Sequence, residues 1–311
     1  MCGSLARSRP PGLRLPNQRL ADLRTRIVCF GDVIDDVVVI PNGPVRDDTD
    51  TPSAIRFRPG GSAANTAAWL GTLGADVDLV ASVGRGDAQR HADQLVGVRA
   101  HLAEHPELPT GAIVVLVDIT SSGGERRHML TERGANAALD PSAVTEDLLA
   151  DAAILHVTGH TLLNPLGIGD LVSRARAAGV AVSISPGSAG FIADYGVEAF
   201  AEAIAGASIV FASLEEGRLL TGLREPREVA AALPFDHVVL TLGMDGVLVA
   251  LDGGSFTVPA VATQVVDPTG AGDAFCAGYL AEWVSSADAR AAASRGTEVA
   301  AKAVARVGAR P

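Results

Sequence analysis

Short apolar runs alternate with segments of helical period along most of the chain. Each run is typical of a strand buried in a parallel sheet, where both faces are covered and polar residues do not alternate with apolar ones. The predicted strands are Arg26–Phe30, Asp76–Ser82, Gly111–Asp118, Ala153–Thr158, Val180–Ile184, Ser208–Phe211 and His237–Leu242.

Helices are expected between these strands. Ile168, Leu171, Val172 and Ala175 recur at helical spacing, and Gly179 ends that helix before the next strand. A strand, a helix and a second parallel strand form a unit with a right-handed crossover. Repetition of this unit predicts an α/β fold, a three-layer α/β/α sandwich with a mostly parallel central sheet.

Two segments interrupt this rhythm. Residues 41–59 and 111–134 show strand-like alternation with Gly and Pro between the strands, and neither has a helical period. We expect these segments to form a small β-lid beside the main sheet. Residues 27–311 are then one domain with the lid attached to it.

The charge distribution separates the first residues from the rest. The 311 residues carry 36 acidic and 25 basic side chains, a net charge of −11, which argues against nucleic acid or an anionic membrane as a partner. Residues 1–26 are basic because they hold six arginines and one aspartate. They have no apolar stretch of the kind found in secretory signals. We predict a disordered N-terminal extension.

The apolar runs and the cysteines indicate the compartment. No run approaches the roughly 18 apolar residues that a membrane helix requires. The three cysteines are an odd number and lack the spacing of a metal site or a disulfide framework. We therefore expect a soluble protein of the reducing cytoplasm.

The most informative run is Val265–Leu280, where a predicted strand turns through small residues into a helix. Successive backbone N–H groups at a helix N-terminus form an anion site that suits a phosphoryl group. Asp273 lies at the mouth of this site, where its carboxylate could accept the proton of an attacking hydroxyl group. On these residues alone, a helix-capping role for Asp273 is the alternative.

Two further runs supply polar groups. Residues 59–67 begin a helix with the paired glycines Gly60 and Gly61 and place Asn65 one turn later. Residues 31–36 place three acids at the carboxyl end of the first strand, the edge where open α/β sheets bind ligands. Acids there suit the hydroxyl groups of a polyol, although a solvated turn is the simpler explanation for this run alone.

Together the three runs resemble the ribokinase family, the PfkB-type carbohydrate kinases, from about Ile27 to the C-terminus. The run from Asp267 to Leu280 fits the C-terminal signature of that family, and Gly60–Asn65 fits its N-terminal one. The resemblance implies a central sheet with helices on both faces and a β-lid over the sugar site. It also implies transfer of the γ-phosphoryl group of ATP, with Mg²⁺, to a hydroxymethyl group of a small sugar or polyol.

The resemblance also assigns roles to individual residues. The catalytic base would be Asp273, and the anion hole would be the backbone N–H groups of Gly270, Ala271, Gly272 and Asp273. The sugar ligands would be Asp36, Gly60, Gly61, Asn65 and Asn136. The nucleotide ligands would be Ser213, Glu216, Thr241, Gly243, Asp245 and Gly246. Glu216 would hold Mg²⁺ through water, and Asp267 with Thr269 would bind a monovalent cation such as K⁺.

The sequence departs from the family pattern at several positions. Ser213 replaces the asparagine that precedes Glu216 in the family element, and Ser185 stands where many relatives carry an acid. Ser62 replaces the lysine of ribokinase itself, so ribose is not carried over as the substrate. The chain ends Gly308-Ala309-Arg310-Pro311, without the hydroxyl residue expected near the cation site.

Two other functions stay open. A nucleoside kinase of the same family would need an aromatic or apolar wall for the base, but aromatic residues are only 4% of the chain and Phe57 is the one predicted near the lid. A catalytically weak sugar-binding or regulatory protein is suggested by Ser213 and Ser185, whereas the intact Asp273 run argues against it. A P-loop kinase is excluded because no Gly-x₄-Gly-Lys-Ser/Thr occurs.

A homodimer through the lid is expected from the family. The lid also favours it, because a small flap presents strand edges that a second copy could cover.

Overall fold

The computed structural model describes residues 24–119, 125–163 and 167–311. Residues 1–23 of the predicted N-terminal extension lie outside this part of the chain, whereas Arg26 begins the first strand. Part of the second predicted lid segment, residues 120–124, also lies outside it. No helix in the described ranges is long and apolar enough to cross a membrane.

A large sheet runs through the middle of the molecule, and its strand order is β13-β12-β11-β10-β9-β8-β1-β4-β5. Its strands are β1 (Arg26–Phe30), β4 (Val77–Gly84), β5 (Arg99–His105), β8 (Ala152–Thr158), β9 (Ala181–Ser185), β10 (Ile209–Ser213), β11 (His237–Thr241), β12 (Val247–Leu251) and β13 (Gly254–Val258). Neighbours from β11 to β5 pair in parallel, and β12 and β13 complete one edge as an antiparallel hairpin.

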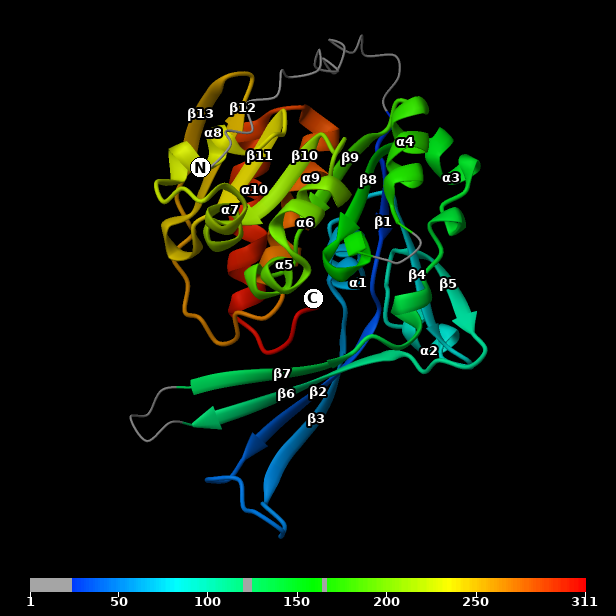
Figure 1. The fold of residues 1–311 in the computed structure, drawn as a ribbon, viewed down its shortest axis with the longest axis vertical. Helices are drawn as coiled ribbons and strands as arrows, with labels where there is room; N and C mark the ends of the chain where they lie inside the picture. Colours follow the sequence, from blue (N-terminus) through cyan, green and yellow to red (C-terminus); the bar gives the residue numbers. More distant parts are fainter. Residues whose placement is uncertain (1–23, 120–124, 164–166) are drawn as a thin grey trace.

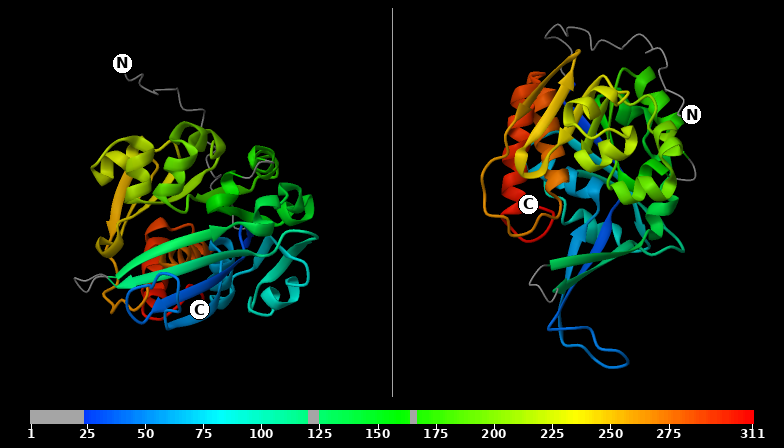
Figure 2. Two further views of the ribbon diagram at one scale, coloured as in Figure 1. Left: turned by 60° about the horizontal axis from the view of Figure 1, so that its bottom comes forward. Right: turned by 60° about the vertical axis from the view of Figure 1, so that its left-hand side comes forward.

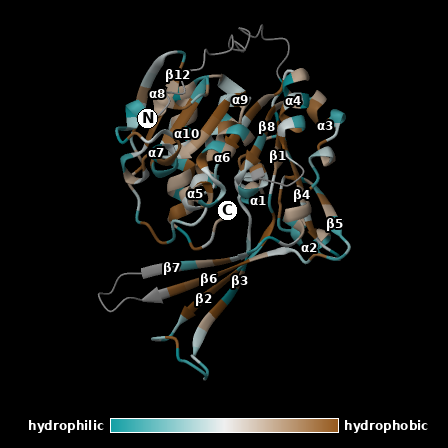
Figure 3. Ribbon diagram, in the orientation of Figure 1, coloured by the Kyte–Doolittle hydropathy of each residue, from teal (hydrophilic) through white to brown (hydrophobic). Residues whose placement is uncertain are grey.

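Helices cover both faces of this sheet, which confirms the predicted three-layer sandwich. One face packs against α1 (Ser62–Thr72), α9 (Ala271–Ser286) and α10 (Ala289–Val304). The other face packs against α3 (Glu146–Ala150), α4 (Gly169–Ala177), α5 (Ala189–Tyr195), α6 (Val197–Ala203), α7 (Leu214–Thr221) and α8 (Pro226–Ala232). Because both faces are covered, β1 and β4 are buried along nearly their whole length and are mainly apolar (Figure 3).

The connections contain shorter helices. They are α2 (Ala88–Ala92) and the 3₁₀ turns η1 (Gly134–Ala138), η2 (Pro141–Ala143), η3 (Gly159–Leu163) and η4 (Gly243–Asp245).

A second sheet of strand order β3-β2-β6-β7 projects from one end of the sandwich, as two views show (Figures 1 and 2). Its strands are β2 (Ile34–Pro41), β3 (Ser53–Gly60), β6 (Gly111–Ile119) and β7 (Glu125–Glu132). We call this sheet the lid.

The first lid segment differs from the prediction: it begins at Ile34 rather than at residue 41, so Asp36 lies on a lid strand and not in a turn. The run Gly111–Asp118 was predicted both as a buried parallel strand and as the start of the second lid segment, and it is the lid strand β6. β6 pairs in parallel with β2 and antiparallel with β7.

The order of the strands locates the crevice. The chain leaves β1 for β4 and β5 on one side and later returns to β8 on the other side. The carboxyl ends of β1 and β8 are therefore the point where the winding direction changes, and ligands of open α/β sheets bind there. The lid begins directly beyond β1, at the same end.

Candidate active site

Asp273 lies in the first turn of α9, behind the tight turn at Gly270. Gly270 has φ of 76°, a left-handed conformation that favours glycine. A Cβ at this position would also lie 2.6 Å from Cβ of Ala309, near the end of the chain. Gly272, by contrast, faces open space. The backbone of residues 270–273 is therefore packed on one side against the C-terminal segment and open at Gly272.

The two signature runs meet at the Asp273 carboxylate. Ser62 Oγ donates to Asp273 Oδ1 at 2.5 Å, and Asn65 Nδ2 donates to Oδ2 at 2.9 Å. Both donors lie on α1, which packs beside α9. The N-cap of α9 is Gly270, and the Asp273 side chain turns toward α1. The capping alternative for Asp273 is therefore wrong.

The surroundings of Asp273 keep its proton affinity high. Burial raises the pKa of Asp273 to about 7, and the nearby charges of Asp32 and Asp36 act in the same direction. The hydrogen bonds from Ser62 and Asn65 lower the pKa, because they favour the ionised carboxylate. A carboxyl group with a pKa near the operating pH is suited to accept a proton during catalysis.

The three acids beyond β1 have different environments. Asp36 lies directly over Gly60, so a Cβ on that glycine would overlap the carboxylate. Burial raises the pKa of Asp36 to about 6, against the effect of the Arg310 charge. Asp35 belongs to the other face of the lid and forms a two-pronged ion pair with Arg90 of α2, with both N···O distances 2.8 Å.

Asp32 is nearly buried at the switch point and accepts a hydrogen bond from the Thr158 hydroxyl at 3.3 Å. Gly61 brings the start of α1 close to it, with φ of 93° and no room for a Cβ beside the Asp32 carbonyl. The predicted sugar residues Asp36, Gly60, Gly61 and Asn65 therefore gather around the same crevice.

Asn136 is committed to backbone contacts. It is 1% exposed, and its Nδ2 donates to the carbonyls of Val33 at 2.9 Å and Arg133 at 3.1 Å. Its Oδ1 accepts from the Val33 N–H at 3.1 Å. Both amide hydrogens are used, so the group holds η1 against the turn between β1 and β2. Direct contact between Asn136 and a sugar stays a prediction.

The predicted nucleotide residues lie at the carboxyl ends of neighbouring strands. Ser213 and Thr241 are register partners on β10 and β11. Ser213 and Glu216 form a capping box at the start of α7: Ser213 Oγ accepts from the Glu216 N–H at 3.2 Å, and Glu216 Oε2 accepts from the Ser213 N–H at 2.6 Å. A serine in place of the family asparagine thus keeps a local structural role. Gly243, Asp245 and Gly246 form the turn after β11.

Glu216 is the residue predicted to hold Mg²⁺ through water. Its carboxylate is 6% exposed, burial raises its pKa, and one of its two oxygens is used by the capping box. Carboxylate oxygens suit Mg²⁺, which keeps several waters and binds one or two protein carboxylates together with substrate phosphates. The described residues contain no cluster of three or more His, Cys, Asp or Glu side chains for a metal.

The predicted cation residues contact each other and the end of the chain. Asp267 Oδ1 accepts from the N–H of Thr269 at 3.0 Å and from its hydroxyl at 2.6 Å. Asp267 Oδ2 accepts from the N–H of Gly308 at 3.1 Å. These oxygens therefore lie at the base of the turn that carries Asp273.

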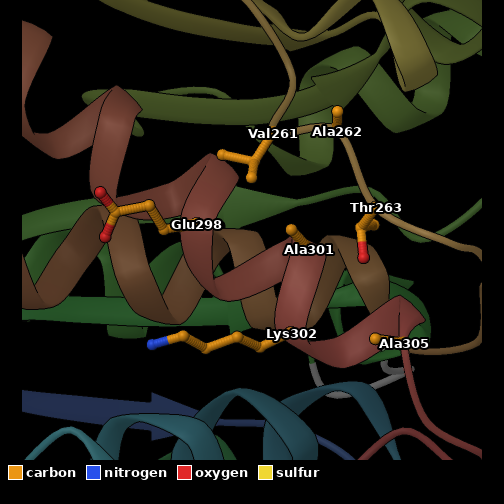
Figure 4. A pocket seen from close by; sticks show the side chains of 7 residues that line it. All are labelled: Val261, Ala262, Thr263, Glu298, Ala301, Lys302 and Ala305. Atoms are coloured by element: carbon orange, nitrogen blue, oxygen red, sulfur yellow. The ribbon is translucent and has the colours of Figure 1, made fainter.

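A cavity of about 330 Å³ lies between the loop after β13 and the second half of α10 (Figure 4). Its lining residues are Val261, Ala262, Thr263, Glu298, Ala301, Lys302 and Ala305. Its volume is within the range of small-molecule sites. The loop starts beside Gly246, because a Cβ there would press on Val258 and Ala260. The loop that lines one side of the cavity therefore begins beside the predicted nucleotide turn.

The prediction missed the roles of Ser62 and Arg310. Ser62 stood out only as a departure from a lysine, yet its hydroxyl contacts Asp273. Arg310 Nη2 donates to the Gly60 carbonyl at 2.7 Å, and its Nε donates to Asn65 Oδ1 at 3.1 Å. Figure 1 shows the C-terminus on the side of the sandwich that faces the lid. No local sequence signal marks a penultimate arginine as part of a site.

Comparisons with known proteins agree with this geometry. The pfkB family of carbohydrate kinases matches residues 24–311. An ATP-dependent ribose-1-phosphate kinase of Halopiger xanaduensis is 31% identical over 92% of this chain and 94% of its own length. A 2-dehydro-3-deoxygluconokinase of Thermoproteus tenax is 27% identical over 88% of this chain and 86% of its own.

A solved structure shows the same fold. An E. coli protein described as a candidate ribokinase II, in complex with ATP and Mg²⁺, superposes with a TM-score of 0.78 at 21% identity, over 92% of this chain and 94% of that one. With the family matched over residues 24–311, the chain belongs to the pfkB family of carbohydrate kinases, which are phosphotransferases with an alcohol group as acceptor.

Proposed function

We propose that this protein transfers the γ-phosphoryl group of ATP to a hydroxymethyl group of a small sugar, with Asp273 as the general base. The observation that carries the proposal is the Asp273 carboxylate, held by Ser62 and Asn65 at the first turn of α9 with its pKa raised to about 7. A base near neutral pKa beside a helix N-terminus combines proton removal with an anion site.

The proposed transfer forms one bond to phosphorus and breaks another, and Asp273 takes up the proton. The acceptor oxygen forms a bond to the γ-phosphorus while its proton passes to Asp273. The bond between the γ-phosphorus and the bridging oxygen of ADP breaks. The backbone N–H groups of Gly270, Gly272 and Asp273 would stabilise the growing negative charge of the transferred group, whereas the Ala271 N–H donates to the Pro268 carbonyl at 3.2 Å. Most of the rate effect in such transfers comes from positioning and charge.

Kinases of this family use ATP with Mg²⁺, and the metal would neutralise phosphate charge when bound. We assign its water-mediated contact to Glu216, whose second carboxylate oxygen is outside the capping box. We also propose that Asp267 and Thr269 bind K⁺. Exchange of K⁺ for Na⁺ in the assay tests that assignment, which predicts a lower rate in Na⁺.

The acceptor side favours a sugar over a nucleoside. Asp36 faces the crevice, and its register partner on β3 is Arg58. Phe57 pairs with Val37, so it belongs to the opposite face of the lid and is 78% exposed. The aromatic residue predicted near the lid therefore does not provide a wall for a base. The carboxylates Asp32 and Asp36 remain to bind hydroxyl groups.

We place the adenine of ATP in the cavity between the loop after β13 and α10. The loop that lines the cavity begins beside Gly246, and the lining consists mainly of small apolar side chains around Ala301. The variant Ala301→Trp tests this placement, because its bulky side chain would fill the cavity. The KM for ATP should rise while the acceptor KM changes little.

We propose that two copies pair through the outer face of the lid. Phe57, Val37, Val114 and Leu130 form one cross-strand row on that face. Phe57 and Leu130 are 78% and 64% exposed, and Ile55 beside them is 56% exposed. A row of exposed apolar side chains on a thin sheet favours association. Sedimentation should give a dimer for the wild type and a monomer for Phe57→Glu.

A coupled assay of ADP release tests the proposed activity. The panel should contain pentoses, hexoses, their phosphates and nucleosides, each with Mg·ATP. Release of ADP that depends on a sugar supports the proposal. If no compound stimulates ADP release while some raise the melting temperature, the protein is a binding or regulatory member of the family.

A further inference from the structure

The C-terminal segment, residues 308–311, is built into the site by a series of specific contacts. The Gly308 N–H donates to Asp267 at 3.1 Å, and the Trp69 indole N–H donates to the Ala309 carbonyl at 2.9 Å. Arg310 then reaches Gly60 and Asn65. Three consecutive residues thus bond to the turn before α9, to α1 and to Gly60 just before α1. A segment anchored at each residue holds its side chain at a defined place.

Arg310 determines the orientation of the Asn65 amide. Its guanidinium contains only donors, so the Asn65 atom that receives its Nε–H must be the oxygen Oδ1. The Asn65 nitrogen is then directed to Asp273 Oδ2, at 2.9 Å. If the amide were flipped, Nδ2 would face the guanidinium and Oδ1 would face the carboxylate, and both contacts would be repulsive. The arginine therefore keeps a hydrogen-bond donor on the base.

Packing alone does not explain this arginine. Of its five N–H groups, two donate to Gly60 and Asn65, and Nη1 is buried with no partner among the described residues. Burial lowers the pKa of Arg310 to about 10, although Asp36, Asp273, Asp35 and Asp32 act against this. Leaving a buried charged donor without a partner destabilises the fold. A purely structural side chain here would be more stable if it were apolar.

We propose that Arg310 is a positioning residue for the catalytic base: through Asn65 it fixes a donor on Asp273 and favours the ionised carboxylate that accepts the proton. This proposal rests on the proposed kinase reaction. Arg310 lies outside both signature runs in the sequence. The proposal therefore adds a residue of the C-terminal segment to the groups that set the pH dependence of catalysis.

The groups that face Asp273 set the sign of the effect. Asp32 and Asp36 lie on the acceptor side and raise its pKa. Asp273 raises the pKa of Arg310, and a neighbouring positive charge favours the ionised form of a carboxylate. Cys276 lies one turn later on α9. Burial, and then the charges of Asp273 and Glu216, raise the pKa of its thiol well above the ordinary value, so it stays protonated. Loss of Arg310 should therefore raise the pKa of the base.

The test compares Arg310→Met with Arg306→Met. Arg306 lies two residues before the C-terminal segment, with its guanidinium 5.4 Å from the centre of the Trp69 ring. No described contact joins it to Asn65 or Asp273. We expect the acid limb of the kcat–pH profile to move up by about half a unit or more in Arg310→Met and not in Arg306→Met. Arg310→Lys keeps a positive charge and should show a smaller shift. This variant also tests the proposal if Arg310→Met folds poorly. Equal profiles for all three variants and the wild type would overturn the proposal.

A double-mutant cycle tests the route through Asn65. In an Asn65→Ala background, Arg310→Met should move the acid limb by less than half as much as in the wild type. A full-sized shift in that background would show that Asn65 does not transmit the effect and would refute the assignment. If the wild type releases no ADP with any acceptor, the proposed kinase reaction fails instead, so the two failures are distinguishable.

Discussion

The hydroxyl of Ser62 donates a 2.5 Å hydrogen bond to Oδ1 of Asp273, from a residue 211 positions earlier in the chain. The bond joins the start of α1 to the start of α9. It also gives a side chain that departs from the ribokinase lysine a direct contact with the proposed base. A lysine there would place a charge beside Asp273, whereas serine supplies a neutral donor and leaves the pKa of Asp273 at about 7.

Ser62→Ala should raise the pKa of the base, because the lost hydrogen bond favoured the ionised form. We expect kcat to fall about threefold near pH 6.5 and to approach the wild-type value above about pH 8.5. The measurement is kcat against pH. Ser173→Ala, which removes a hydroxyl bonded to a helix carbonyl on α4, is the control. A uniform loss at every pH would contradict this explanation.

Asp273→Asn should stabilise the fold at high pH. The folded pKa of about 7 lies above the value of about 3.9 in the unfolded chain, so the folded state holds this proton more tightly. Stability from this group is present at low pH and is lost as pH rises to about 7. The asparagine variant should therefore exceed the wild type in Tm by about 3 °C or more at pH 8, and by less at pH 5. Equal differences at both pH values would argue against a raised pKa.

Gly60→Ala should weaken acceptor binding. The added Cβ would overlap the Asp36 carboxylate, which must then move out of the crevice. We expect the acceptor KM to rise about tenfold or more with the KM for ATP unchanged. Gly190→Ala on α5 adds the same methyl group in open space and is the matched control. An unchanged acceptor KM in Gly60→Ala would remove Asp36 from the acceptor site.

Arg90→Gln should loosen the lid. Arg90 ties α2 to Asp35 of β2 by two contacts of 2.8 Å, and both side chains are partly exposed. A pair of this kind contributes about 0–1 kcal/mol, so Tm should change little while the acceptor KM rises about threefold. Arg174→Gln breaks an ion pair on α4, away from the lid, and should leave the acceptor KM unchanged. A rise in both variants would point to a general loss of structure.

The fold was predictable where strands are buried on both faces. β1, β8 and β11 are mainly apolar runs because helices cover both faces of the sheet. β5 was missed because it is an edge strand in which charged and apolar residues alternate. β12 and β13 form an edge hairpin, and no strand was predicted there.

The site was predictable as far as its short runs extend. The glycines around Asp273 and the pair before α1 mark close backbone approaches, which leave a local pattern. Contacts between distant segments leave none. The Ser62 hydroxyl and the Arg310 guanidinium reach the site only after α1, α9 and the end of the chain have packed together. The backbone role of Asn136 likewise depends on the β1–β2 turn.

The most direct test of the account is kcat for ADP release by Asp273→Ala, beside Asp236→Ala, an exposed aspartate just before β11. Both are measured at saturating Mg·ATP with the acceptor that the screen identifies, and acceptor affinity is measured by calorimetry. We predict that Asp273→Ala lowers kcat at least about a hundredfold with acceptor affinity nearly unchanged, and that Asp236→Ala stays within about twofold of the wild type. An Asp273→Ala enzyme that retains more than about a tenth of the wild-type kcat would contradict the central claim.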